Sequence, residues 1–146
     1  MSEIKKLKKA VAWIDGSYNS VTNKYGCGGF LLENGTKHII KELGDDPGMA
    51  TMHNVAGEIL GAMRAAQKAS DLGITELTIF HDYDGVAAWV NSRWKCRSPY
   101  TRKYASTMWA LMAKGLKIIF KHVKSHSGNE QNDEADRLAK EAVGLA

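Results

Sequence analysis

The stretch GCGGFLLENGTKHIIKEL, residues 26–43, decides the fold. Two apolar runs flank the dipeptide Asn34-Gly35, which is a strong signal for a tight hairpin turn because both residue types tolerate positive φ. A further short apolar run, KKAVAWID, precedes the hairpin at residues 8–15. The sequence therefore predicts three strands at the start of the chain, of which the second and third form an antiparallel hairpin.

The rest of the chain alternates helical and strand patterns. From about residue 51 to residue 72, apolar residues recur at helical spacing, which predicts a helix packed by one face. Further along, the patterns predict a strand at 75–82, a short helix at 84–91, a basic loop broken by Pro99 at 95–103, a helix at 104–114, a strand at 116–123 and a helix at 132–143. The order β-β-β-α-β-α-α-β-α predicts an α/β fold, a five-stranded mixed sheet flanked by helices.

Length and composition bound the class of protein. The 146 residues, 44% of them hydrophobic, suit a single domain spanning residues 1–146, with residues 1–8 as a basic N-terminal arm. No run approaches the ~18 apolar residues of a membrane span, and no apolar signal-peptide core follows the Lys-rich start. Cys27 and Cys96 form neither a pair pattern nor a metal-binding spacing. We expect a soluble, cytoplasmic monomer with reduced thiols and no membrane partner.

The charge distribution points to an anionic partner. The formal net charge is +4 and the sequence pI is about 9.0. Between Asp84 and Glu130 there is no acidic residue, whereas an ordinary soluble surface intersperses both signs. The interval instead carries Arg93, Lys95, Arg97, Arg102, Lys103, Lys114, Lys117, Lys121 and Lys124. This segregation predicts binding to a polyphosphate such as a nucleic acid.

Four carboxylates stand out by their positions. Asp15 and Asp82 each close an apolar strand, where ligands usually bind in open α/β sheets. Glu58 and Asp136 lie at helical spacing and project near the margin of an apolar stripe, neither buried nor fully exposed. Each has an ordinary alternative: turn chemistry for the two strand-end aspartates, a solvated side chain for Glu58, and an i,i+4 ion pair with Lys140 for Asp136.

The segments that contain these carboxylates resemble the successive motifs of type 1 ribonuclease H. The segments are IDGSYN at 14–19, NVAGE at 54–58, FHDYDGV at 80–86 and KSHSGNEQNDEADRLA at 124–139. Their order and their strand or helix contexts match over about residues 9–142. The resemblance implies a ribonuclease H-like fold and an endonuclease that hydrolyses the RNA strand of RNA/DNA hybrids. It further implies 5′-phosphate and 3′-hydroxyl ends and two Mg²⁺ ions, for which Mn²⁺ can substitute.

The resemblance also implies roles for individual acids. Asp15 would bridge both ions, Asp136 would help to hold the ion that activates the attacking water, and Glu58 and Asp82 would hold the ion on the leaving-group side. This residue type suits the metal, because Mg²⁺ prefers oxygen ligands and keeps several waters, so a few carboxylates open to a substrate phosphate serve it well. Asp84 is an alternative to Asp82, and the strand-end position favours Asp82.

Other residues match substrate-binding and loop positions of the family. His126 would assist proton transfer or product departure, the alternative being an exposed loop histidine. Asn132 resembles a helix-starting residue that sets Asp136 one turn further along, and Asn54 would read the minor groove unless it is only a polar first-turn residue. The remaining candidate substrate contacts are Gly16 and Ser17, through their main chain, and Arg93, Trp94, Lys95 and Arg97 in the basic, aromatic segment at 92–104.

The sequence also departs from the family pattern. Only a short connection lies between Asn91 and Tyr100, where many members carry an extra basic helix and loop. His53 stands where a Thr commonly helps to grip a DNA phosphate. Two alternatives remain: a non-catalytic hybrid-binding module, which leaves the four acids unexplained, and a DNA-cutting nuclease of the same fold, such as an integrase or resolvase. The terminal helix, with His126 ten residues before Asp136, favours ribonuclease H over the latter.

Overall fold

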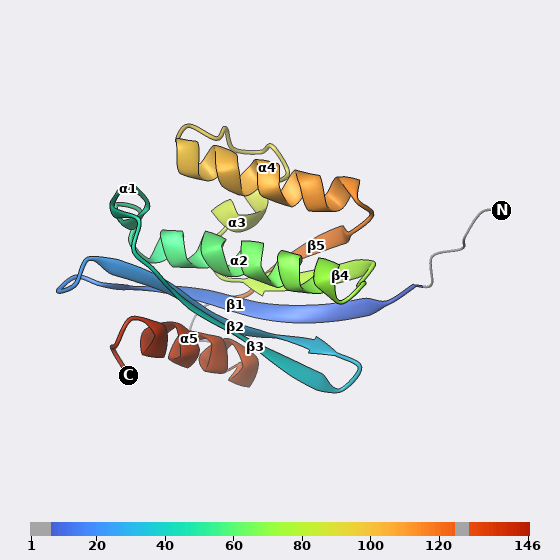
Figure 1. The fold of residues 1–146 in the computed structure, drawn as a ribbon, viewed down its shortest axis with the longest axis horizontal. Helices are drawn as coiled ribbons and strands as arrows, with labels where there is room; N and C mark the ends of the chain where they lie inside the picture. The colour runs from blue at the N-terminus through green and yellow to red at the C-terminus, as the bar shows by residue number, and fades with distance from the viewer. Residues whose placement is uncertain (1–6, 125–128) are drawn as a thin grey trace.

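A central mixed sheet organises the chain. The computed structural model describes residues 7–124 and 129–146, and within them five strands form one sheet of order β3-β2-β1-β4-β5 (Figure 1). The strands β1, β2 and β3 pair antiparallel, whereas β4 pairs parallel with β1 and β5 pairs parallel with β4. Their bounds are Lys9–Asn19 for β1, Lys24–Glu33 for β2, Thr36–Gly44 for β3, Glu76–His81 for β4 and Lys117–His122 for β5. The predicted mixed α/β sheet is confirmed.

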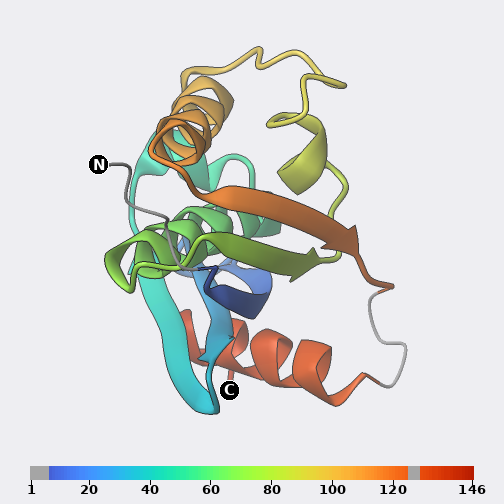
Figure 2. The same ribbon diagram turned by 90° about the vertical axis from the view of Figure 1, so that its right-hand side faces the viewer.

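Helices cover both faces of this sheet. The longest helix, α2, packs on one face together with α3 and α4, and α5 packs on the other (Figures 1 and 2). The bounds are Pro47–Ala50 for α1, Asn54–Asp71 for α2, Gly85–Ala88 for α3, Pro99–Ala113 for α4 and Glu130–Ala142 for α5. Buried side chains such as Ile14, Ile59, Leu77 and Met108 fill the layer between the sheet and the α2 face. Across the described residues, no helix combines the length and apolar character needed to cross a bilayer.

The hairpin at residues 26–43 forms as its sequence predicts. Glu33 pairs with Thr36, so that Asn34 and Gly35 alone make the turn. Both have positive φ, 47° for Asn34 and 82° for Gly35, as a two-residue hairpin turn requires. This turn fixes the register of β2 against β3.

Close approach of α2 to the sheet depends on glycines. A Cβ atom on Gly16 would lie 2.2 Å from the carbonyl oxygen of Asn54 and 2.3 Å from the backbone nitrogen of Glu58. A Cβ atom on Gly57 would lie 2.0 Å from the carbonyl oxygen of Gly26. No other residue fits at either contact without moving the helix, and this contact brings Glu58 beside β1.

Two predicted helix starts differ from the structure. The helix predicted to begin at Tyr104 begins at Pro99, because Ser98 and Thr101 form a reciprocal capping box and proline suits the first helical position. The residue that caps α5 is Asn129, whose side chain accepts a hydrogen bond from the Asn132 backbone N–H at 3.0 Å. The prediction that Asn132 starts the terminal helix was therefore wrong, and Asn132 lies buried in the first turn.

Candidate active site

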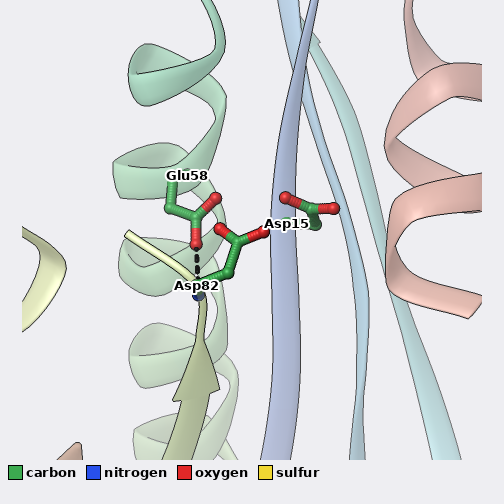
Figure 3. Close-up of side chains that lie close together, drawn as sticks. All are labelled: Asp15, Glu58 and Asp82. Atoms are coloured by element: carbon green, nitrogen blue, oxygen red, sulfur yellow. Dashed lines mark hydrogen bonds between the residues drawn. The ribbon is translucent and has the colours of Figure 1, made fainter. Parts of the chain in front are cut away.

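Parallel pairing of β1 and β4 brings two strand-end aspartates together. The last paired residues of these strands are Trp13 and Phe80. Asp15 and Asp82 each lie two residues beyond that pair, so they reach the same level of the sheet edge. Figure 3 shows their carboxylates side by side. The sequence pattern predicted that each aspartate closes a strand, and the resemblance to ribonuclease H implied that the two share one site.

Glu58 completes a cluster of three carboxylates from three elements. Its side chain is 1% exposed and accepts a hydrogen bond from the backbone N–H of Asp82 at 3.2 Å (Figure 3). One carboxylate oxygen from each of Asp15, Glu58 and Asp82 lies within 4.8 Å of the other two. The prediction that Glu58 is neither buried nor exposed was wrong, because the glycine contact between α2 and β1 encloses this side chain.

The electrostatics of the cluster favour a divalent cation. Burial, and then the charge of Asp82, raise the pKa of Asp15 from its ordinary 3.8 to about 7. Burial, and then the charge of Asp15, hold the pKa of Glu58 well above its ordinary range. These acids therefore repel one another when ionised, and a bound cation would relieve that repulsion. Three carboxylates with oxygens this close together fit Mg²⁺ or Mn²⁺, which prefer oxygen ligands.

Asp136 belongs to the helix that packs on the face of the sheet opposite α2 (Figure 2). It comes from α5, and its charge contributes to raising the pKa of Asp15. It is not among the carboxylates whose oxygens lie within 4.8 Å of one another. Its Oδ2 atom instead lies 2.9 Å from the Nζ atom of Lys140, which is the i,i+4 ion pair named above as its alternative role. The structure thus brings three of the four predicted acids into one cluster, with the fourth adjacent.

The geometry also separates Asp82 from Asp84. Asp84 is not among the carboxylates grouped within 4.8 Å, and its side chain accepts two hydrogen bonds from the Arg93 guanidinium, at 3.0 and 3.2 Å. This ion pair holds the pKa of Asp84 below its usual range. Arg93, predicted to contact substrate, already has a carboxylate partner. Of these two acids, Asp82 is therefore the one that lies in the carboxylate cluster.

The other predicted substrate contacts lie around one end of α2. Asn54 is its exposed first residue, whereas Ser17 on β1 is buried and Gly16 packs under the helix. The exposed side chains of Lys95 and Arg97 line a groove of about 360 Å³ together with Thr51 and Met52, just before α2. The basic loop and the end of α2 that carries Asn54 thus share one surface.

Of the two remaining predicted site residues, Trp94 and His126, the structure describes Trp94. Trp94 is 39% exposed and makes edge contacts with Tyr83 and Trp89, so part of its ring packs within the protein. His126 lies outside the described residues.

The sequence pattern did not single out His81, which precedes Asp82 and is nearly fully buried. The pattern that could have identified it is a histidine at an inward-facing position of an apolar strand.

The fold and the cluster together define a class of protein: an α/β domain whose carboxylates meet at the edge of a mixed sheet in an arrangement suited to a divalent cation. The RNase H family model matches residues 8–144. The chain therefore belongs to the RNase H family, and it is an enzyme of the ribonuclease class.

Individual relatives agree with this family. The chain is 27% identical over 145 residues to the ribonuclease H of Cereibacter sphaeroides, covering 92% of this chain and 93% of that protein. It is 24% identical to the N-terminal RNase H domain of a Mycobacterium tuberculosis protein, with a TM-score of 0.75 and 94% of each chain covered. The RNase H1 LC11, isolated from compost and solved with an RNA/DNA hybrid, has a TM-score of 0.74 at 16% identity, over 92% of this chain and 96% of that one. The last two likenesses concern the fold.

Proposed function

We propose that this enzyme hydrolyses the RNA strand of RNA/DNA hybrids internally, with two Mg²⁺ ions, and leaves 5′-phosphate and 3′-hydroxyl ends. The observation that carries the proposal is the cluster of Asp15, Glu58 and Asp82 within 4.8 Å in a chain of the RNase H family. The hybrid bound to the compost RNase H1, a protein of the same fold, supports this substrate class.

Four carboxylates of the chain would hold the ions. Asp15, central in the group, would serve both, with Glu58 and Asp82 on one side and Asp136 on the other. When bound, the two ions would stabilise the charge on the attacking and departing oxygens of an in-line displacement. Mn²⁺ would substitute because it accepts the same oxygen donors.

The protein fixes these ligands before the substrate arrives. The Gly16 backbone N–H donates to Asp15 Oδ1 at 2.8 Å, and the Asp82 N–H donates to Glu58. Asp15 is only 7% exposed, so its carboxylate has little freedom to turn toward solvent. Ligands held in this way need little rearrangement during the reaction, which is how preorganised sites lower a barrier.

The hybrid would lie across the surface shared by the start of α2 and the basic loop. Asn54, with the main chain of Gly16 and Ser17, would contact the RNA strand near the cluster, where 2′-hydroxyls distinguish RNA from DNA. Lys95 and Arg97 would contact phosphates, and Trp94 would offer the exposed part of its ring to a sugar. Asn132, buried in the first turn of α5, would act through the orientation of this helix, which also carries Asp136. His126 would assist proton transfer or product departure.

A strand-labelled cleavage assay tests the proposal. RNA/DNA, RNA/RNA and DNA/DNA duplexes of one sequence are incubated with the enzyme and Mg²⁺, with each strand labelled in turn. The proposal expects cuts in the RNA strand of the hybrid alone. A ligase should rejoin the products, because ligation requires a 5′-phosphate and a 3′-hydroxyl. Equal cleavage of DNA/DNA would favour the alternative nuclease, and hybrid binding without any cleavage would favour the binding module.

A further inference from the structure

A buried histidine contacts the backbone next to the carboxylate cluster. His81 is the last residue of β4, directly precedes Asp82 and is 1% exposed. Its Nδ1 atom lies 3.0 Å from the carbonyl oxygen of Tyr83. A carbonyl oxygen can only accept a hydrogen bond, so Nδ1 must carry the proton. Among the described residues, the other ring nitrogen, Nε2, has no hydrogen-bond partner although it is buried.

The carbonyl that His81 contacts belongs to a short chain of hydrogen bonds. The oxygen of Tyr83 also accepts from the Val86 backbone N–H at 3.1 Å, so both of its lone pairs are used. The carbonyl of Val86 in turn accepts from the hydroxyl of Tyr104, a fully buried residue of α4, at 2.6 Å. The turn from Asp82 to Val86 is thus tied to β4 by the imidazole and to α4 by the phenol.

This arrangement fixes the backbone on both sides of Asp82. On the amino side, its own N–H donates to Glu58 at 3.2 Å. On the carboxyl side, the next residue's carbonyl is held by His81. The backbone between these two bonds sets the direction of the Asp82 Cα–Cβ bond, and the side chain that starts there faces Asp15 and Glu58 (Figure 3).

Packing alone does not account for a histidine at this place. The ring lies edge-on against Phe120 and His122, with centroids 5.9 and 5.6 Å away. An apolar side chain would fill the same space without burying the unpaired Nε2, which carries a desolvation cost. What an apolar side chain could not supply is the donor to the Tyr83 carbonyl.

We infer that His81 is a positioning residue for the metal site, which orients Asp82 by donating its Nδ1 proton to the carbonyl oxygen of Tyr83. For its effect on turnover, this inference rests on the function proposed above. Removing a group that orients a metal ligand without contacting the metal typically lowers metal affinity or activity by about 10- to 100-fold.

Two variants of nearly equal shape separate the donor from the packing. His81→Asn keeps an N–H donor one bond beyond Cγ, as in the imidazole, whereas His81→Leu has almost the same shape and no donor. Both lose the same ring volume, so a difference between them reports the hydrogen bond. His122→Leu, which removes a ring contact and leaves the Nδ1 bond intact, is the control.

The measurements are Mg²⁺ affinity by calorimetry without nucleic acid, followed by kcat and KM on a hybrid. We expect His81→Leu to weaken Mg²⁺ binding and lower kcat by about tenfold or more with KM little changed, and His81→Asn and His122→Leu to stay within about threefold of wild type. Equal losses in both His81 variants would overturn the inference, because they would assign the effect to lost volume. Unchanged Mg²⁺ affinity in His81→Leu would also overturn it.

The wild-type protein provides a test that needs no substitution. Nitrogen chemical shifts of the His81 ring should show a protonated Nδ1 and a bare Nε2, and a proton on Nε2 instead would overturn the inference. The calorimetry and the chemical shifts do not involve the hybrid. If the wild-type enzyme fails to cut hybrids, the proposed function fails, while these two measurements still decide the role of His81.

Discussion

Replacing Asp15 with asparagine should stabilise the metal-free fold at alkaline pH. In the folded chain the pKa of Asp15 is raised from 3.8 to about 7, by burial first and by the charge of Asp82 second. The folded state therefore binds this proton more tightly than the unfolded state, and stability falls as pH rises from about 4 to about 7. Asparagine has a similar shape and no charge, so it removes this loss.

The size of the effect follows from the difference in pKa. A tenfold difference in proton affinity is worth about 1.4 kcal/mol, so the ionised Asp15 carboxylate destabilises the fold by up to about 4 kcal/mol at pH 8. At pH 4 the carboxyl is largely neutral in the folded protein, and the variant and the wild type should have nearly equal free energies of unfolding. For a chain of 146 residues, the difference at pH 8 corresponds to roughly 10 °C in the unfolding temperature.

The assay is urea denaturation and thermal unfolding in chelator, at pH 4, 6 and 8. Asp84→Asn is the matched control, because Asp84 is tied to Arg93 and its pKa is lowered, so its replacement should give no gain at pH 8. A gain for Asp15→Asn that is as large at pH 4 as at pH 8 would refute the reasoning. So would an equal gain in Asp84→Asn, since it would reflect net charge and not the buried cluster.

Three further predictions concern the metal, the acids and the basic loop. Mg²⁺ should raise the unfolding temperature of the wild type and not that of Asp15→Asn. Ca²⁺ should bind yet support little turnover, because its coordination is looser. Chelator should abolish cleavage, and full cleavage after exhaustive chelation would contradict the metal site. Asp82→Asn should lose cleavage while Asp84→Asn keeps most of it, and the opposite result in a hybrid-cleavage assay would move the ligand by two residues. The double substitution Lys95→Gln and Arg97→Gln should raise KM with kcat little changed, and should reduce the slope of log affinity against log salt by about two, one for each lost phosphate contact. Lys68→Gln, on the exposed face of α2, is a control. An unchanged salt slope in the double variant would mean that the hybrid docks elsewhere.

Local signals predicted the parts of this protein that depend on local chemistry. The turn at Asn34-Gly35 and the strand-end positions of Asp15 and Asp82 followed from residue types and spacing, since a tight turn and the end of an apolar run depend on neighbouring residues. The burial of Glu58 did not follow, because it depends on how closely two glycines let α2 approach the sheet. Helical spacing alone places that side chain at the margin of a stripe.

Start positions of helices were predictable only to within a few residues. Asn129 and Asn132 are the same residue type, one that commonly caps helices, so residue type alone does not distinguish them; the structure has Asn129 as the cap of α5. A proline within a basic segment predicts a break in a loop, whereas the reciprocal Ser98 and Thr101 bonds make Pro99 the first residue of a helix. The link from His81 to Tyr83 was not predictable, since a buried histidine gives no sign in sequence of which carbonyl it will meet.

The most direct test of the central claim compares wild type and Asp15→Asn on one RNA/DNA hybrid labelled on the RNA strand. Cleavage under single-turnover conditions with Mg²⁺ and hybrid affinity are both measured. If the carboxylate cluster is the catalytic centre, wild type cuts the RNA strand and Asp15→Asn does not. Asp15→Asn should still bind the hybrid with affinity close to that of wild type. Cleavage by Asp15→Asn at the wild-type rate would contradict the claim.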